Sequence, residues 1–215
     1  MPKSTKRPDF SEEIALWDVG VNNVCGIDEA GRGCWAGPIV AGAVVFNRDI
    51  SKLPNGVSEI NDSKKITPKK REKIAHFITN HAKHWGIGYV TSKELDKIGL
   101  TASNILAMER AVLNLGVGAN FYLVDGNIMR NSQIIKHFKN IIKGDSRSLS
   151  IAAASIIAKV FRDKVMESVD TQYPEYDFGD HKGYGTEKHR KQIKRYGILP
   201  IHRKSFAPIK ELLTL

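Results

Sequence analysis

The chain has 215 residues, of which 41% are hydrophobic, so it is long enough for one large domain with a substantial core, or for one domain with a small appendage. Its 33 lysines and arginines against 23 acids leave a net charge of +10, which favours a polyanionic partner such as nucleic acid, although basic proteins without such a partner are common. No apolar run reaches the roughly 18 residues of a membrane span, no signal region follows the basic start, and only Cys25 and Cys34 could pair. We therefore expect a cytoplasmic monomer without a disulfide or a membrane segment.

The first half of the chain predicts two strands, a helix and a third strand. Residues 1–20 are polar and are expected to be loosely ordered. An apolar strand ends at Asp28, and a second strand over residues 39–46 pairs with it as a hairpin with a long turn. Thr67 is placed as the N-cap of a helix whose first residue is proline, and residues 85–90 form the next strand.

The second half predicts alternating helices and strands. Thr91 and Glu94 have the spacing of a capping box, and a longer helix with apolar residues at helical spacing begins at Thr101. Two strands ending at Asp125 and Lys143 follow. A helix rich in small residues, over residues 148–169, is expected to pack closely on the sheet. Two C-terminal helices are expected over residues 186–196 and 208–213. This order predicts an α/β domain with a mixed central sheet.

Two adjacent acids, Asp28 and Glu29, come directly out of the first apolar strand and lead into a turn with glycines at positions 31 and 33. Because burying neighbouring acids is costly, we expect a cation to hold them. Adjacent strand residues point to opposite faces, so both side chains reach one ion only if the strand ends there. The alternative is that the two acids open a solvated loop.

Asp125 and Asp145 each follow a short β-rich stretch in the same manner. Either one alone reads as a turn residue, but strand ends are where α/β sheets build their sites. Four hard oxygen ligands without a cluster of cysteines or histidines favour Mg2+ or Mn2+ over zinc.

Seven short segments, taken in order along residues 24–206, resemble the type 2 ribonucleases H, or ribonuclease HII family. These segments are residues 26–33, 36–44, 61–65, 124–127, 143–145, 151–160 with Arg162 and Asp163, and 181–186. One departure is visible, because Cys34 and Trp35 stand where the family usually has proline and an aliphatic residue. The related ribonuclease HIII carries a substantial N-terminal substrate-binding domain, whereas about 23 residues precede the first expected strand here.

The resemblance implies an α/β ribonuclease H-like fold: a mixed five-stranded central sheet flanked by helices, with a small C-terminal helical portion. It implies a catalytic domain over residues 21–170, preceded by the loosely ordered residues 1–20. Residues 171–215 would form a helical substrate-binding extension packed on the same domain. Within this stretch, residues 181–215 carry nine lysines and arginines against two acids, and residues 52–73 carry seven against three. Charges of this kind fit phosphate contacts, although charge runs are more often solvated faces.

The resemblance further implies an endoribonuclease that hydrolyses the RNA strand of RNA/DNA hybrids. It would also cut 5′ of ribonucleotides embedded in duplex DNA, leaving a 3′ hydroxyl and a 5′ phosphate. Two divalent ions, Mg2+ or Mn2+, are implied and no small-molecule cofactor. The implied catalytic and metal-binding residues are Asp28, Glu29, Asp125 and Asp145; the implied substrate-binding residues are Gly31, Arg32, Gly33, Lys64 and Tyr184.

Several alternatives stay open at this point. The chain could be a DNA junction-resolving nuclease of the same broad fold, or a binding module whose acids hold a structural ion. Tyr184 could be a buried structural tyrosine rather than a nucleotide contact. Lys159, Arg162 and Asp163 could face the site or be surface charge, whereas His181 and His189 are assigned no catalytic role.

Overall fold

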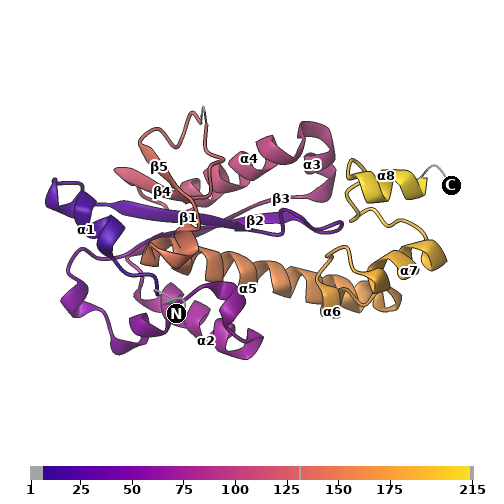
Figure 1. Cartoon of the computed structure of the whole chain (residues 1–215), viewed down its shortest axis with the longest axis horizontal. Helices are drawn as coiled ribbons and strands as arrows, with labels where there is room; N and C mark the ends of the chain where they lie inside the picture. The colour runs from indigo at the N-terminus through magenta and orange to yellow at the C-terminus, as the bar shows by residue number, and fades with distance from the viewer. Residues whose placement is uncertain (1–6, 131, 214–215) are drawn as a thin grey trace, which may run out of the picture.

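The centre of the molecule is a five-stranded mixed sheet in the order β3-β2-β1-β4-β5 (Figure 1). The computed structural model describes residues 7–130 and 132–213. Antiparallel pairing joins β1 to β2 and β2 to β3, whereas β1, β4 and β5 run parallel. The bounds are β1 (Val24–Ala30), β2 (Ile39–Val45), β3 (His84–Val90), β4 (Phe121–Asp125) and β5 (Phe138–Ile141). The mixed sheet expected from the sequence, with its leading hairpin, is confirmed.

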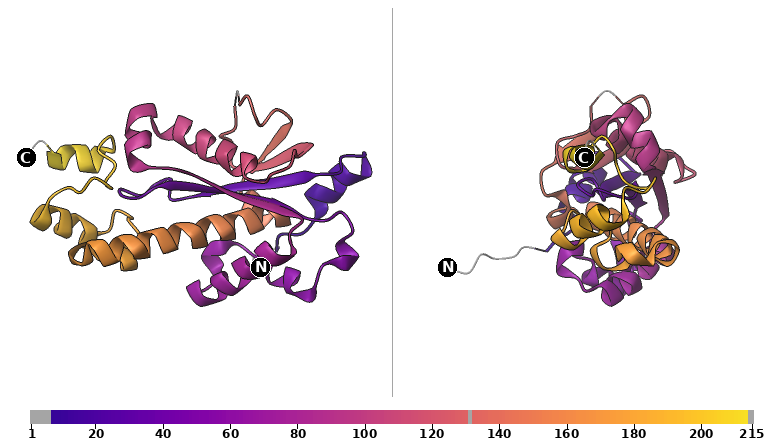
Figure 2. Two further views of the ribbon diagram at one scale, coloured as in Figure 1. Left: turned by 180° about the vertical axis from the view of Figure 1, so that it is seen from behind. Right: turned by 90° about the vertical axis from the view of Figure 1, so that its right-hand side faces the viewer.

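Helices cover both faces of this sheet (Figure 2). One face carries α3 (Ser92–Ile98) and α4 (Leu100–Leu113), and the other carries α5 (Leu149–Gln172), with α2 (Pro68–His81) packed against α5. The predicted capping box at the start of α3 is present. At α2, Thr67 occupies the N-cap position, but its side chain makes no capping hydrogen bond. Short 3-10 turns complete the chain, at η1 (Ile50–Lys52), η2 (Asn55–Glu59), η3 (Ser63–Lys65), η4 (Gly144–Ser146) and η5 (Pro174–Tyr176).

The small residues of α5 let it lie unusually close to the sheet, as predicted. Its alanines from Ala152 to Ala154 are fully buried. A methyl group added to Gly26 of β1 would come within 2.2 Å of the Ser150 backbone, and one added to Gly42 of β2 within 2.4 Å of the Ala154 carbonyl oxygen. Backbone therefore packs directly on backbone here, and this contact fixes α5 relative to β1.

The N-terminal segment corrects one expectation. Of residues 1–20, the structure describes 7–20, and these include the helix α1 (Ser11–Asp18), so this stretch is not loosely ordered. Glu13 is buried and accepts hydrogen bonds from Ser148 and Ser150, and Trp17 is buried against the sheet. Residues 1–6, which belong to the same expectation, lie outside the described residues.

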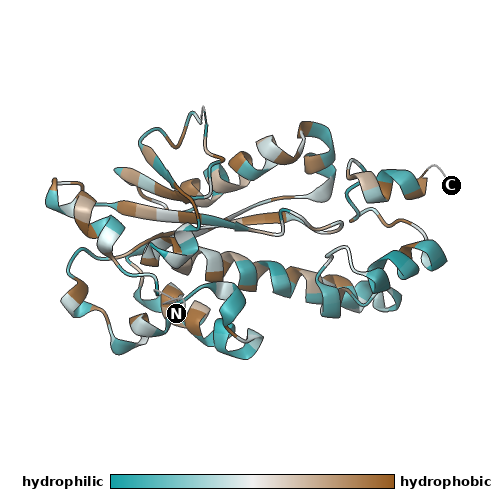
Figure 3. Cartoon of the chain, in the orientation of Figure 1, coloured by the Kyte–Doolittle hydropathy of each residue, from teal (hydrophilic) through white to brown (hydrophobic). Residues whose placement is uncertain are grey.

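The C-terminal helices α6 (Phe178–His181), α7 (Glu187–Tyr196) and α8 (Ala207–Leu213) follow the far end of α5, at the right of Figure 1. They enclose a small core of their own around Phe178. Figure 3 shows α7 as strongly hydrophilic, whereas the central strands are largely hydrophobic. None of the helices formed by the described residues has the length and apolar character needed to span a bilayer. Cys25 and Cys34 are both free and buried.

Candidate active site

The first pair of acids lies near the end of β1. Asp28 pairs with Gly42 of β2 and is only 6% exposed. The strand continues to Ala30, two residues beyond the predicted end, and turns only at Gly31, whose φ of +87° favours glycine. Asp28 and Glu29 therefore keep the alternation of a strand and point to opposite faces, which the sequence analysis did not expect.

The second pair lies on the neighbouring strands. β4 runs parallel to β1, with Val124 opposite Ile27, so Asp125 ends its strand beside the first pair. The Gly144 N–H donates to Asp125 Oδ1 at 2.6 Å and ties Asp125 to the turn that carries Asp145. That turn differs from expectation, because β5 ends at Ile141 and Lys143 adopts a left-handed conformation ahead of a 3-10 turn.

A pocket of about 220 Å³ brings most of the expected site residues together. Its walls come from β1, the turn after β1, the end of β4, η3, α2, α5 and the loop after α6. Asp145 does not line this pocket, but Lys64 Nζ lies 3.7 Å from its carboxylate. The lining residues are Asp28, Glu29, Ala30, Gly31, Arg32, Gly33, Ser63, Lys64, Arg71, Asp125, Ser155, Lys159 and Tyr184.

The carboxylates in this pocket repel one another. Burial, together with the charges of Glu29 and Asp125, raises the pKa of Asp28 well above its ordinary value. Burial also raises the pKa of Asp125, and Asp145 adds to that rise. Burial alone would lower the pKa of Lys64. The acids around it, first of all Asp145, outweigh that effect, so the pKa is raised overall. Arg71 and Lys159 on the same wall pair with Asp163, and the pKa values of Asp28 and Asp125 stay raised despite the cations around them.

These acids suit a hard divalent cation in their chemistry, although they are not gathered at one point. Across residues 7–130 and 132–213, no three His, Cys, Asp or Glu side chains form a ready metal-binding group. Glu29 Oε2 is buried and has no hydrogen-bond partner among the described residues. Carboxylate oxygens that lack partners and raise each other's pKa are stabilised by Mg2+ or Mn2+, so the residues fit the implied ions.

Ser155 of α5, Ser63 of η3 and Arg71 of α2, which the sequence analysis did not single out, complete the pocket wall together with Lys159, one of the residues left open there. Ser155 lies beside Asp28 and forms a hydroxyl contact of 3.1 Å with Ser63, next to Lys64. Arg71 is buried and donates to the Ser63 carbonyl at 3.0 Å. Arg71 and Lys159 both pair with Asp163, at 3.5 and 2.7 Å. The four-residue spacing of Ser155, Lys159 and Asp163 along one helix face was the available signal.

Tyr184 lies at the edge of the pocket and is 44% exposed, so it is not a buried structural tyrosine. The Lys159 ammonium lies 5.7 Å from the centre of its ring and the Arg162 guanidinium 5.9 Å. Both flanking glycines are constrained. Gly183 has a φ of +80°, and a methyl group on Gly185 would collide with Trp35. The backbone around Tyr184 is thus fixed, while nearly half of the residue remains exposed.

Two fully buried arginines fix the loop after β1. Arg203 donates to the Arg32 carbonyl at 2.8 Å and twice to the Gly37 carbonyl. Arg162 donates to the carbonyls of residues 36, 38 and 182 at 2.8–3.0 Å. Arg162 is therefore not surface charge. The departure at Cys34 and Trp35 lies inside this loop, and the Trp35 N–H donates to the Gly183 carbonyl at 2.8 Å, which docks the loop on the C-terminal segment.

The two histidines that were assigned no catalytic role do not line the pocket; they lie in the C-terminal core, where His189 Nδ1 is 2.9 Å from the Tyr184 carbonyl oxygen. His181 and His189 stack with ring centres 4.3 Å apart. His189 Nε2 lies 3.1 Å from His202 Nε2, and all three side chains are buried. They act as structural hydrogen-bond partners.

Comparison with known proteins agrees with this architecture. The family model described as ribonuclease HII matches residues 25–209. The ribonuclease HII of Chloroflexus aggregans is 42% identical over 208 residues, 97% of each chain. The solved ribonuclease H2 of Pyrococcus horikoshii has a TM-score of 0.73 at 26% identity, over 88% of this chain and 96% of that chain. The solved Bst-RNase HIII in complex with Mn2+ has a TM-score of 0.71 at 21% identity, over 94% of this chain and 72% of that chain, which confirms the ribonuclease H-like fold.

Proposed function

The chain belongs to the ribonuclease HII family and is a type 2 ribonuclease H endonuclease, and we propose that it hydrolyses the RNA strand of RNA/DNA hybrids. We also propose that it cuts 5′ of ribonucleotides embedded in duplex DNA, as in ribonucleotide excision during DNA replication and repair, leaving a 3′ hydroxyl and a 5′ phosphate. The observation that carries this proposal is the single pocket in which Asp28, Glu29 and Asp125 face Lys64 and Tyr184.

Four acids would hold two divalent ions, Mg2+ or Mn2+: Asp28, Glu29, Asp125 and Asp145. When bound, such ions supply a water-derived nucleophile and stabilise the leaving 3′ oxygen. The repulsion among Asp28, Glu29 and Asp125 supports this assignment, because a bound cation would relieve it. The Mn2+ complex of Bst-RNase HIII, a protein of the same fold, is consistent with it.

The substrate would be held by the turn at Gly31, Arg32 and Gly33 together with Lys64 and Tyr184. A methyl group on Gly33 would meet nothing within 4 Å, so a ligand has room to approach the backbone there and to contact a ribose 2′ hydroxyl. Tyr184 presents an open ring face on which a sugar or base can pack. Lys64 is exposed enough to reach a phosphate.

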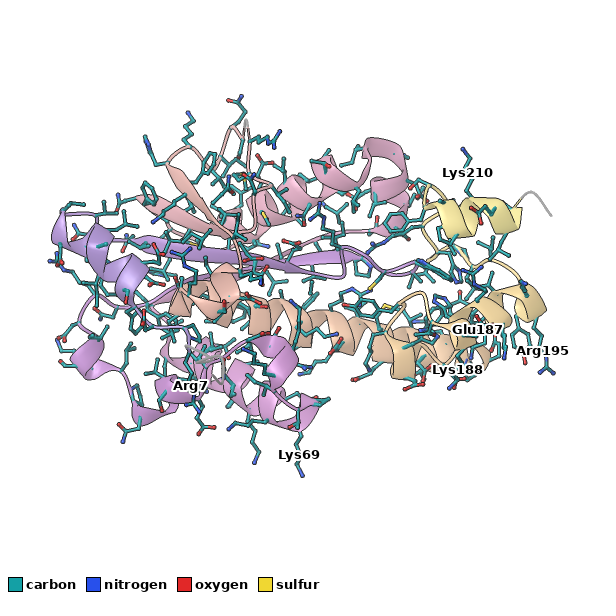
Figure 4. The ribbon with its side chains drawn as sticks, viewed as in Figure 1. Arg7, Lys69, Glu187, Lys188, Arg195 and Lys210 are labelled. Carbon is teal, nitrogen blue, oxygen red and sulfur yellow. The ribbon has the colours of Figure 1, made fainter. Side chains whose placement is uncertain are left out.

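Residues 171–215 would extend the substrate surface of the catalytic domain. In α7, Arg195 points outward from the C-terminal end of the molecule (Figure 4), whereas Lys188 is ion-paired with Asp177 and Asp180 at 3.0 and 3.3 Å. Basic side chains of this kind suit the phosphates of a duplex beyond the cleavage point. α5 runs two residues past the boundary at residue 170, so the catalytic domain and this extension share one continuous helix.

The test is a cleavage assay on labelled RNA/DNA hybrid, on DNA with one embedded ribonucleotide, on plain DNA and on branched DNA, each with Mg2+, Mn2+ or a chelator. We expect metal-dependent cutting confined to ribose-containing strands, with the stated ends. Cutting of branched DNA would instead indicate a junction-resolving nuclease. Tight binding without cutting would indicate a binding module.

A further inference from the structure

Helix α4 carries two neighbouring polar side chains, Ser103 and Asn104, that are both fully buried. In the part of the chain that the structure describes, Ser103 Oγ and both amide atoms of Asn104 lack a hydrogen-bond partner. The next turns of the same face are apolar, with Ala107 and Met108 in the main core. A buried amide with no partner costs roughly 1–3 kcal/mol, so its presence calls for a role.

The side chain that Asn104 faces is Glu29. Cys25 and Ile27 pack in the same core as α4, and strand side chains alternate, so Glu29 extends from β1 toward α4. Asp28 points to the other face, where it meets Ser155 of α5. Burial raises the pKa of Glu29, and the nearby Asn104 amide partly offsets that rise. The Asn104 amide is thus close enough to interact with the Glu29 carboxylate, but Glu29 Oε2 and the two amide atoms of Asn104 do not reach the distance and angles of a full hydrogen bond among the described residues.

We propose that Asn104 is a positioning residue for Glu29, with an amide that donates to the free Glu29 oxygen once the pocket holds its divalent ions. This rests on the proposed role of Glu29 as a metal ligand. Asp28 extends to the opposite face of the sheet, so Asn104 can serve Glu29 and not Asp28. A donor on this face restricts the rotation of Glu29 and leaves its other oxygen for the pocket.

This role differs from a structural one in a measurable way. Replacing a buried, unpaired amide by an apolar side chain of similar branching leaves fewer unsatisfied groups, so Asn104→Leu should keep or raise thermal stability. A positioning residue that is lost should at the same time weaken metal binding. Stability and metal affinity therefore move in opposite directions if Asn104 serves Glu29, and together if it only supports the core.

The experiment measures Mn2+ affinity without substrate, by paramagnetic resonance or titration calorimetry, on folded Asn104→Leu and Asn104→Ala. Ser103→Ala is the matched control, because Ser103 is its neighbour, equally buried and equally unpartnered. We expect both Asn104 variants to bind Mn2+ about tenfold more weakly, the lower end for a lost hydrogen bond to a charged group. Ser103→Ala should bind Mn2+ as wild type does. In cleavage of the hybrid, kcat should fall while KM for the hybrid stays unchanged.

Wild-type Mn2+ affinity in either folded Asn104 variant would overturn the proposal, as would an equal loss in Ser103→Ala. If Asn104→Leu does not fold, Asn104→Ala decides by the same measurement. The proposed function fails separately, when wild-type protein cuts no ribose-containing strand; the Mn2+ comparison then still decides the relation between Asn104 and Glu29.

Discussion

At the scale of single residues, Asp28 and Asp125 combine a raised pKa with a place on the pocket wall. We expect Asp28→Asn and Asp125→Asn each to reduce hybrid cleavage to below a few per cent of wild type, because the amide cannot replace a charged metal ligand. Hybrid binding should stay largely intact, since removing a negative charge lowers repulsion of phosphates. Cleavage and fluorescence anisotropy measure the two effects. Asp49 is exposed, so Asp49→Asn serves as the control. Substantial residual cleavage by Asp28→Asn or Asp125→Asn would refute the assignment.

Tyr184 permits a second prediction at this scale, because its ring is exposed while its neighbours are fixed. Tyr184→Ala should cut DNA with one embedded ribonucleotide roughly tenfold more slowly, since stacking contributes on the order of 1–3 kcal/mol. Tyr184→Phe removes the hydroxyl and keeps the ring, so it should keep the part of the cleavage rate that depends on stacking. The measurement compares kcat/KM on the embedded ribonucleotide and on a long hybrid. If both variants cut both substrates as wild type does, Tyr184 has no part in recognition.

At the scale of elements, the sequence predicted those features that depend on residues close together in the chain. The capping box of Thr91 and Glu94 forms within four residues and was found from spacing alone. Helix α1 was missed because it is held by residues far along the chain; the Ser148 hydroxyl, for example, donates a hydrogen bond to the Glu13 carboxylate. The burial of Arg162 was equally invisible, since its acceptors include a carbonyl 126 residues away. The sequence placed Asp28, Glu29 and Asp125 near strand ends, and the structure brings these three to one pocket. The length of β1, and hence the opposite faces of Asp28 and Glu29, could not be predicted.

The close contact of α5 with the sheet makes a prediction about Gly42, which lies opposite Asp28. Gly42→Ala would place a methyl group 2.4 Å from the Ala154 carbonyl oxygen, so α5 must shift. We expect a loss of about 1–3 kcal/mol in unfolding free energy, as for overpacked cores. The melting temperature should fall by roughly 2–4 °C per kcal/mol in a chain of this size. Gly118→Ala, whose methyl group would meet nothing within 4 Å, should melt as wild type does.

At the scale of the whole molecule, the C-terminal segment both closes the candidate site and carries the buried histidines. Arg203 holds the Arg32 carbonyl, and Trp35 is hydrogen-bonded to Gly183, so the loop after β1 is shaped by residues far along the chain. The region around α7 therefore contributes to the geometry of the turn as well as to surface charge. Any condition that destabilises the region around α7 is therefore expected to change the geometry of the pocket as well.

Acid is one such condition, because burial lowers the pKa of His189 to about 3 and that of His202 to about 4. Both histidines are neutral in the folded protein near pH 5, whereas the unfolded chain binds protons below its ordinary pKa of about 6.5. Where the unfolded state binds more protons, stability falls with falling pH, so their contribution is lost from about pH 6.5 down to about pH 4. Each histidine should cost about 2 kcal/mol of unfolding free energy between pH 7.5 and pH 5.

Asp28, Glu29 and Asp125 act in the opposite sense, because their raised pKa values favour the folded state on acidification. The net slope of the wild type therefore mixes both effects, and a variant must separate them. We expect His202→Asn to lose less stability than wild type between pH 7.5 and pH 5, by about 2 kcal/mol in urea unfolding followed by circular dichroism. Replacement of the exposed His76 by Asn should leave the wild-type slope. An unchanged slope in His202→Asn would show that His202 does not stay neutral in the folded protein, and the C-terminal core would then not be the acid-sensitive part of the molecule.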